Sequence, residues 1–262
     1  VYLRHPRPEL VLRAGEIVWD HGSYLPHTTP YQIPDHLRSS VHLRPVTEAD
    51  FAVKVPVRPG FPGGTAVVNL IGQDGISIRT QRVQKTLPLS AERDGFACLK
   101  TAPCLKMAVF NRYGRDQHGI GLLTGMDGVT GAAALTYGHD CHNLTVYGGN
   151  DADMALAANT LRDAQGGLCT AENGKVLTLI PLPLAGLMCD QSPEALLAQM
   201  EQFLADCRRM GFTHKNLLTF FTLMPLAVSP ELKCTDRGLV DALHKRLLPL
   251  IEEIKEISSD GT

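Results

Sequence analysis

Four side chains that can do chemistry lie within five residues near the middle of the sequence. They are His139, Asp140, His142 and Asn143. Two imidazoles, a carboxylate and an amide are costly to bury unless each is hydrogen-bonded or bound to a ligand. The flanking residues 134–137 and 144–147 are mostly apolar, β-branched or aromatic, which predicts buried strands. The cluster is therefore either a satisfied polar network or a binding site.

Three roles are open for this cluster. His139 and His142 could be metal ligands, with Asp140 as a third ligand or as the carboxylate that orients a ring. The four side chains could instead line a pocket for a small molecule, without a metal. In the third interpretation they form a hydrogen-bonded loop in which Asn143 caps a turn. Because a metal normally takes three or four ligands, the first role needs more than two imidazoles.

Other polar residues are better explained by structure than by chemistry. Asn150 or Asp151 is placed to cap a helix, and Asp153 to interact favourably with its dipole. Cys141 has no activating arrangement beyond its histidine neighbours, so we do not expect a nucleophile there. In the block 230–241, an exposed ion pair would account for Glu231, Lys233 and Asp236.

Composition limits the possible classes of protein. The chain has 262 residues, 44% hydrophobic and 20% charged, which is an ordinary globular composition. A net charge of -2 offers no electrostatic attraction for nucleic acid, and no apolar run reaches the roughly 20 residues of a membrane span. Seven scattered cysteines without a Cys-x-x-Cys pair favour reduced thiols. We therefore expect a cytoplasmic protein that binds neither nucleic acid nor membrane.

The elements that must position the cluster are β-rich in the first half of the chain. Apolar triplets around Gly15 predict a hairpin over 9–22, and four prolines predict an extended crossing segment over 23–45. The Asn173-Gly174 pair predicts a hairpin over 168–180. Further strands are predicted at 66–71, 76–83, 106–113, 120–123, 132–136 and 144–147.

Three helices are predicted in the second half. The first follows Asn150, the second runs from Ser192 to Gly211, and the third starts at Thr235 or Asp236 and is kinked by Pro249. The apolar segment 217–228 is expected in the interior. The predicted fold class is α+β or mixed α/β, a short N-terminal β segment followed by a sheet-containing domain with about three packed helices and no TIM barrel.

Six blocks of residues run in fixed order from the cluster toward the C-terminus: GHDCHN (138–143), GGNDADM (148–154), GGL (166–168), NGKV (173–176), PLPLAGLM (181–188) and PELKCTDRGLVD (230–241). Together they resemble the C-terminal domain of bacterial and archaeal adenine deaminases, which belong to the metal-dependent amidohydrolase superfamily. The resemblance implies that residues 1–55 are a remnant of the superfamily's small β-domain and a proline-rich linker. Residues 56–262 would then form the C-terminal α/β domain.

The resemblance also implies a reaction and a cofactor for the full enzyme. A divalent metal, manganese or iron, would activate water to attack the amino-bearing carbon of adenine, giving hypoxanthine and ammonia. In that family the metal site lies in an N-terminal (β/α)8 barrel marked by His-x-His, and no His-x-His occurs here. We therefore expect a chain without the catalytic barrel, inactive alone. Because it opens with Val1, it is expected to be the C-terminal part of a longer protein, or else a natural barrel-less protein.

Two functions remain open for such a chain. It could support active-site closure or dimerisation in an adenine deaminase-like enzyme that acts on a purine base, as a homodimer or in association with a barrel domain. It could instead be a non-catalytic module, derived from that family, that binds a small ligand or a metal or dimerises. The apolar segment 217–228 favours dimerisation.

Overall fold

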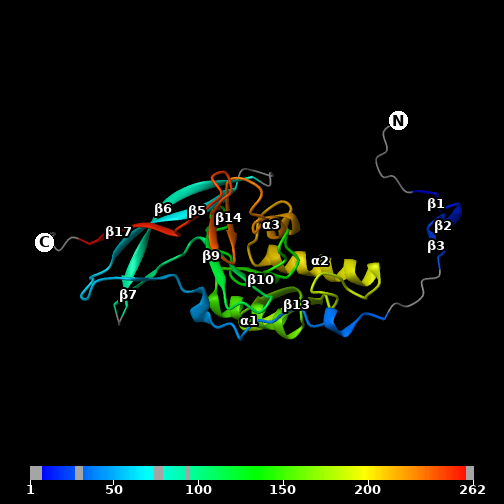
Figure 1. Cartoon of the computed structure of the whole chain (residues 1–262), viewed down its shortest axis with the longest axis horizontal. Helices are drawn as coiled ribbons and strands as arrows, with labels where there is room; N and C mark the ends of the chain where they lie inside the picture. The colour runs from blue at the N-terminus through cyan, green and yellow to red at the C-terminus, as the bar shows by residue number, and fades with distance from the viewer. Residues whose placement is uncertain (1–7, 27–31, 74–78, 93–94, 258–262) are drawn as a thin grey trace. The chain divides into compact units, whose positions relative to one another are not determined.

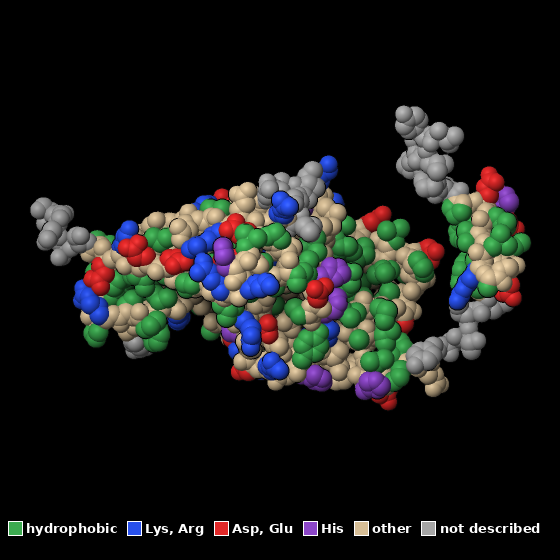
Figure 2. Space-filling view, turned by 45° about the horizontal axis from the view of Figure 1, so that its top comes forward, with side chains coloured by type: hydrophobic (Ala, Val, Ile, Leu, Met, Phe, Trp, Pro, Cys, Tyr) green, Lys and Arg blue, Asp and Glu red, His purple; other side chains and the backbone are tan. Residues whose placement is uncertain are grey.

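The first compact unit of the molecule is a small antiparallel sheet. The computed structural model describes residues 8–26, 32–73, 79–92 and 95–257, and these divide into the units Val1–Pro34 and Asp35–Thr262. In the first unit, β1 (Leu10–Arg13), β2 (Glu16–Asp20) and β3 (Ser23–Tyr24) pair in order. Ala14 and Gly15 turn the chain with φ of 51° and 87°, which confirms the predicted hairpin. Much of this sheet's surface is apolar (Figure 2), including the exposed Leu12 and Tyr24.

The second unit is built around one large sheet (Figure 1). Its strand order in the described residues is β13-β12-β10-β11-β8-β9-β5-β6-β7-β4, and β17 pairs with β5 as an eleventh strand. Neighbours are antiparallel except β5 and β9, which meet in parallel at Ile71 and Leu123. The strands are β4 (Lys54–Pro56), β5 (Gly64–Gln73), β6 (Thr80–Ala91), β7 (Phe96–Leu99), β8 (Leu105–Phe110), β9 (His118–Leu123), β10 (Ala132–Leu135), β11 (Leu144–Gly148), β12 (Gly167–Glu172), β13 (Lys175–Pro181) and β17 (Ile251–Glu256).

Helices cover both faces of this sheet. Side chains alternate along β10, so Ala132 and Ala134 face α1 (Asp151–Asp163) while Ala133 and Leu135 face α2 (Pro193–Arg209) and α3 (Leu217–Leu223). Figure 1 shows α1 on one side of the strands and α2 and α3 on the other. The sheet is thus buried on both faces at β10 and β11. This burial fixes the ends of the loop that joins these two strands. None of the helices in these described ranges combines the length and apolar character that a membrane crossing needs.

Most predicted elements are confirmed. The helices after Asn150 and Ser192 are α1 and α2, and the hairpin at Asn173-Gly174 joins β12 to β13, with φ of 54° and 73° at the two turn residues. The strand predicted over 76–83 begins in the structure at Thr80 and continues to Ala91, and residues 74–78 lie outside the described residues. With α1, α2 and α3 and no closed barrel in the described part of the chain, the mixed α+β class is confirmed.

The prediction of a helix after Thr235 is wrong. This region forms a third sheet of β14 (Leu232–Thr235), β15 (Gly238–Asp241) and β16 (Arg246–Leu248), and Pro249 separates β16 from β17. Gly238, at φ 99°, makes the tight turn after β14, a conformation that breaks a helix. The Asp241 carboxylate accepts a hydrogen bond from the His244 amide at 3.1 Å and so closes the next turn. Leucine spacing that fits a helix is thus overridden by two tight turns.

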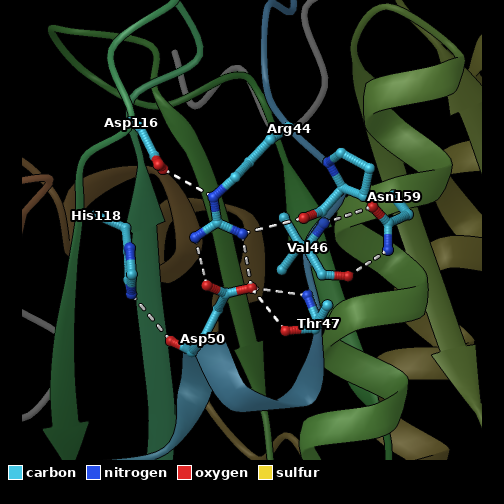
Figure 3. A network of polar contacts seen from close by, with 8 residues as sticks. Arg44, Val46, Thr47, Asp50, Asp116, His118 and Asn159 are labelled. Atoms are coloured by element: carbon cyan, nitrogen blue, oxygen red, sulfur yellow. Dashed lines mark hydrogen bonds and ion pairs between the residues drawn. The ribbon is translucent and has the colours of Figure 1, made fainter.

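A polar network within the second unit includes Arg44, near the end of the crossing segment (Figure 3). Asp50 accepts two bonds from the Arg44 guanidinium, at 2.5 and 3.0 Å, and one from the Thr47 amide at 2.7 Å. Val46 exchanges backbone bonds with the side chain of Asn159 on α1, and His118 of β9 contacts the Asp50 carbonyl. Residues 35–51 therefore pack with the second unit. The assignment of residues 1–55 to a β-domain remnant and linker stays a prediction.

We predict that this network contributes acid-sensitive stability. The hydrogen bond from Arg44 lowers the pKa of Asp50 to about 2. A carboxyl group with a folded pKa below its unfolded value stabilises the fold above pH ~4, and that stability is lost as pH falls toward the folded pKa. D50N should therefore cost about 1–2 kcal/mol at pH 6 in urea unfolding, and the difference from wild type should shrink by pH 2.5. D127N, at an exposed aspartate, is the control; an equal cost of D50N at both pH values would contradict the assignment.

Candidate functional site

The four-residue cluster lies in the loop that joins β10 to β11. These strands pair antiparallel, with Leu135 opposite Thr145, so the loop over residues 136–143 connects the ends of two interior strands of the sheet. Asp140 is exposed, His139 and His142 are half-buried, and Asn143 is only 4% exposed. The structure therefore brings the four residues into one loop with a graded exposure to solvent.

The loop is held by its own backbone and by α3. The His142 amide donates to the Gly138 carbonyl at 2.8 Å, and the His139 amide donates to the Thr222 carbonyl at 3.2 Å. The imidazoles are neighbours, with ring centroids 6.0 Å apart, and the Tyr137 ring lies within 6 Å of both. His142 itself has a φ of 48°, which is strained for a residue with a side chain.

A buried arginine anchors this loop. Arg112, which follows β8, is 2% exposed and donates to three backbone carbonyls. Its Nε reaches His142 at 2.5 Å, and its two terminal nitrogens reach Ser40 at 2.6 Å and Ala185 at 3.0 Å. Within the described ranges no carboxylate pairs with it, and its guanidinium lies 4.8 Å from the centre of the Tyr113 ring. The cation thereby joins the loop to the crossing segment and to residues 181–188.

The environment keeps His142 neutral. Burial lowers the pKa of His142, electrostatic interactions with His139 and Arg112 lower it further, and Asp140 opposes them. The Gly138 amide lies 3.3 Å from His142 Nδ1, so this nitrogen accepts a hydrogen bond and the neutral ring carries its proton on Nε2. Nε2 of the neutral His142 ring can therefore donate a hydrogen bond to a ligand that contacts it.

The side chains of this loop do not by themselves form a ligand set for manganese or iron. In the described part of the chain, no three His, Cys, Asp or Glu side chains are grouped as metal ligands. A metal-bound histidine usually donates its other ring nitrogen to an oxygen, whereas His142 Nδ1 accepts from an amide. The assignment of His139 and His142 as metal ligands stays a prediction, and no chemical step through a metal follows from this geometry.

Asn143 does not accept, from any residue that the structure describes, the hydrogen bond that a turn cap needs in the third interpretation of the cluster. Its buried Oδ1 has no hydrogen-bond partner among the described residues, and neither does Oγ1 of Thr145, which lies two residues further on in β11. Alternation places these two side chains on the same face of the strand. Buried polar atoms left unpaired cost free energy, so a partner for Asn143 would be favourable.

A pocket of about 420 Å³ opens beside the loop. Asp140 and Cys141 form part of its wall, and the rest comes from residues 225–228, 235–240 and 245–247. Of the four residues predicted to line a pocket, only Asp140 lines this one. The apolar segment 217–228 contributes Pro225 and Val228 to the wall, while its α3 residues Phe220 and Phe221 are buried in the core.

Two residues in the family-like blocks have structural roles that the sequence did not reveal. Asn150 caps α1, as predicted, but the buried carboxylate of Asp153 accepts from the amides of Asn173 and Gly174 at 3.0 and 2.8 Å. Asp153 therefore locks the β12–β13 turn onto α1. Lys233 in β14 is completely buried, which lowers its pKa to about 8, so an exposed ion pair does not explain it.

Comparisons with known proteins agree with the blocks read from the sequence. The family model of the adenine deaminase C-terminal domain matches residues 77–246. Adenine deaminase of Moorella thermoacetica is 35% identical over 245 residues, 92% of this chain and 40% of the relative. Adenine deaminase 2 of Shouchella clausii is 34% identical over 92% of this chain, and adenine deaminase of Methylobacterium nodulans is 39% identical over 80% of it. The chain spans about 40% of the length of the curated relatives that match it over most of its residues.

We predict that R112M destabilises the protein by roughly 2–4 kcal/mol. The substitution fills similar space but removes the guanidinium donors of three partly buried carbonyls. R112K keeps the charge and loses the planar fork, so its cost should be intermediate. Urea unfolding measures both, with R115M at a nearby exposed arginine as control. A cost of R112M no larger than that of R115M would show that the three carbonyls do not need the guanidinium.

Proposed function

This chain belongs to the adenine deaminase C-terminal domain family, and we propose that it is the supporting domain of an adenine deaminase-like aminohydrolase. In the whole enzyme, a divalent metal would supply the activated water that converts adenine to hypoxanthine and ammonia. The role of this domain would be to present the loop at His139–Asn143 to that reaction site and to help enclose the purine base. The domain alone would be inactive.

The observation that carries this proposal is the Arg112-anchored loop. A buried cation, two backbone bonds and a strained φ at His142 hold accessible polar groups in one geometry. Such pre-organisation is expected where side chains position a substrate. The neutral His142 suits hydrogen bonding to a purine, whose ring nitrogens are acceptors, better than it suits charge pairing.

A non-catalytic binding module is the second candidate, and the pocket beside the loop favours it. If the loop bound a metal in this chain, purified protein would contain stoichiometric manganese or iron that H142A removes. Dimerisation through 217–228 has less support, because Leu217, Phe220, Phe221 and Met224 are already buried in this chain's own core.

All seven cysteines are free, which supports our proposal of a cytoplasmic location.

We predict that the purified chain does not deaminate adenine. Neither manganese nor iron should produce hypoxanthine, because the described residues offer no complete metal site. Hypoxanthine formation is followed by chromatography, with a catalytically competent adenine deaminase as positive control. Turnover by this chain that H139A and H142A abolish would contradict a purely supporting role.

We also predict an effect of the loop on a complete enzyme. When this sequence is joined to its catalytic barrel, H142A should lower kcat by about tenfold or more without reducing bound metal, since one hydrogen bond to the reacting base is lost. D127N, at an exposed site outside the loop, should leave kcat unchanged. Unchanged kcat in both H139A and H142A would exclude a role for the loop in the reaction.

A further inference from the structure

We propose that the pocket beside the loop binds a nucleoside monophosphate that carries an amino group on its base. The pocket measures about 420 Å³, which lies in the range of small-molecule sites and exceeds the needs of a bare ion. Three separate segments build it: the loop at Asp140, the residues after α3, and the two turns of the β14–β15–β16 sheet. The proposal concerns this chain alone and does not depend on the proposed function.

Cationic side chains supply the site for the phosphate. Arg237, on the β14–β15 turn, and Lys245, on the β15–β16 turn, both line the pocket and are exposed. Neither makes an ion pair within the described part of the chain. Arg246 also lines the pocket, but the Asp241 carboxylate already accepts from its Nε at 3.3 Å. A guanidinium and an ammonium group together favour a phosphate, whose oxygens accept several charge-assisted hydrogen bonds.

The turns hold these cations in place. Asp241 is buried and accepts from both the amide and the ring of His244, at 3.1 and 2.7 Å, as well as from Arg246. This network fixes the turn that carries Lys245, whose own φ is 52°. On the other turn, the Arg237 amide donates to Thr235 Oγ1 at 3.2 Å. The backbone on which the two cations stand is therefore ordered before any ligand arrives, which lowers the entropy cost of binding.

Apolar side chains supply a surface for a flat base. Val228 is 77% exposed and Leu247 is 55% exposed, although both are aliphatic, and both line the pocket together with Val240 and Pro225. A planar heteroaromatic ring laid on these side chains would remove apolar surface from water. Figure 2 shows that Lys and Arg side chains lie among apolar ones on the face of the second unit that it presents.

Two carboxylates select the kind of base and disfavour a bare anion. Asp236 Oδ2 is oriented by a 2.9 Å hydrogen bond from Asn111, and Asp140 accepts no hydrogen bond from the described residues. A free carboxylate suits an exocyclic amino group, which donates, and repels an anion that has no donor. An occupant that carries both a hydrogen-bond donor and a phosphate matches this mixed lining, which is the chemistry of AMP or CMP.

Calorimetric titration of the purified chain with AMP tests this assignment. We expect saturable binding, about tenfold weaker binding of adenosine and of inorganic phosphate, and weaker binding of IMP, which lacks the amino group. The double variant R237Q/K245Q should weaken AMP binding about tenfold or more, whereas K175Q/K215Q, at exposed lysines outside the pocket, should not. D140N should remove the preference for AMP over IMP.

The same titration can overturn the proposal. No saturable AMP binding up to about 10 mM, or AMP binding that R237Q/K245Q leaves unchanged, would exclude the site. Inorganic phosphate binding as tightly as AMP would reduce it to a bare anion site and contradict a role for the base. All substituted side chains are exposed, and unchanged thermal unfolding confirms that the variants are folded. None of these outcomes measures deamination, so they leave the proposed function to its own tests.

Discussion

The loop that carries the candidate site depends on Arg112, a buried positive charge with which no carboxylate pairs in the part of the chain that the structure describes. Water solvates a guanidinium strongly, and removing it from water is expensive unless its donors are all satisfied. Here three backbone carbonyls from three distant segments replace water around Arg112. Carbonyl groups carry no net charge, so a net positive charge stays beside His142 and helps to keep that imidazole neutral. One side chain thereby holds the shape of the loop and adds to the effect of burial, which is the main cause of the lowered pKa of His142.

Close backbone packing makes this arrangement possible. The β14–β15 hairpin lies directly on β9, where a Cβ at Gly119 would overlap Thr235 and one at Gly121 would press on Cys234. Gly186 similarly makes room for Arg112, since a Cβ there would lie 2.9 Å from the guanidinium. These approaches bring the loop, the β15–β16 turn and the end of α3 around one pocket. The groups around this pocket come from the β10–β11 loop, from the segment between α3 and β14, and from the β14–β15–β16 sheet and its turns.

The sequence predicted what is local and missed what is long-range. The polar cluster, the caps at Asn150 and Ser192, and the Asn173-Gly174 turn are recognisable because each depends on a few consecutive residues. The role of Arg112 could not be inferred from the sequence. Its hydrogen-bond partners lie 30 to 73 residues away along the chain and are backbone carbonyls, which every residue has. The false helix after Thr235 arose because leucines at 239, 243, 247 and 250 fit helical spacing, whereas Gly238 and Asp241 formed turns.

Hydrogen exchange at the loop amides tests the central claim most directly. The amides of His139 and His142 are bonded to carbonyls within a structure that Arg112 holds together. In R112M, under conditions where the variant remains folded, their exchange should accelerate at least about tenfold, while amides in α2 keep their protection. Unchanged exchange at residues 138–143 in a folded R112M protein would show that the loop holds its shape without the buried cation, and would contradict this account.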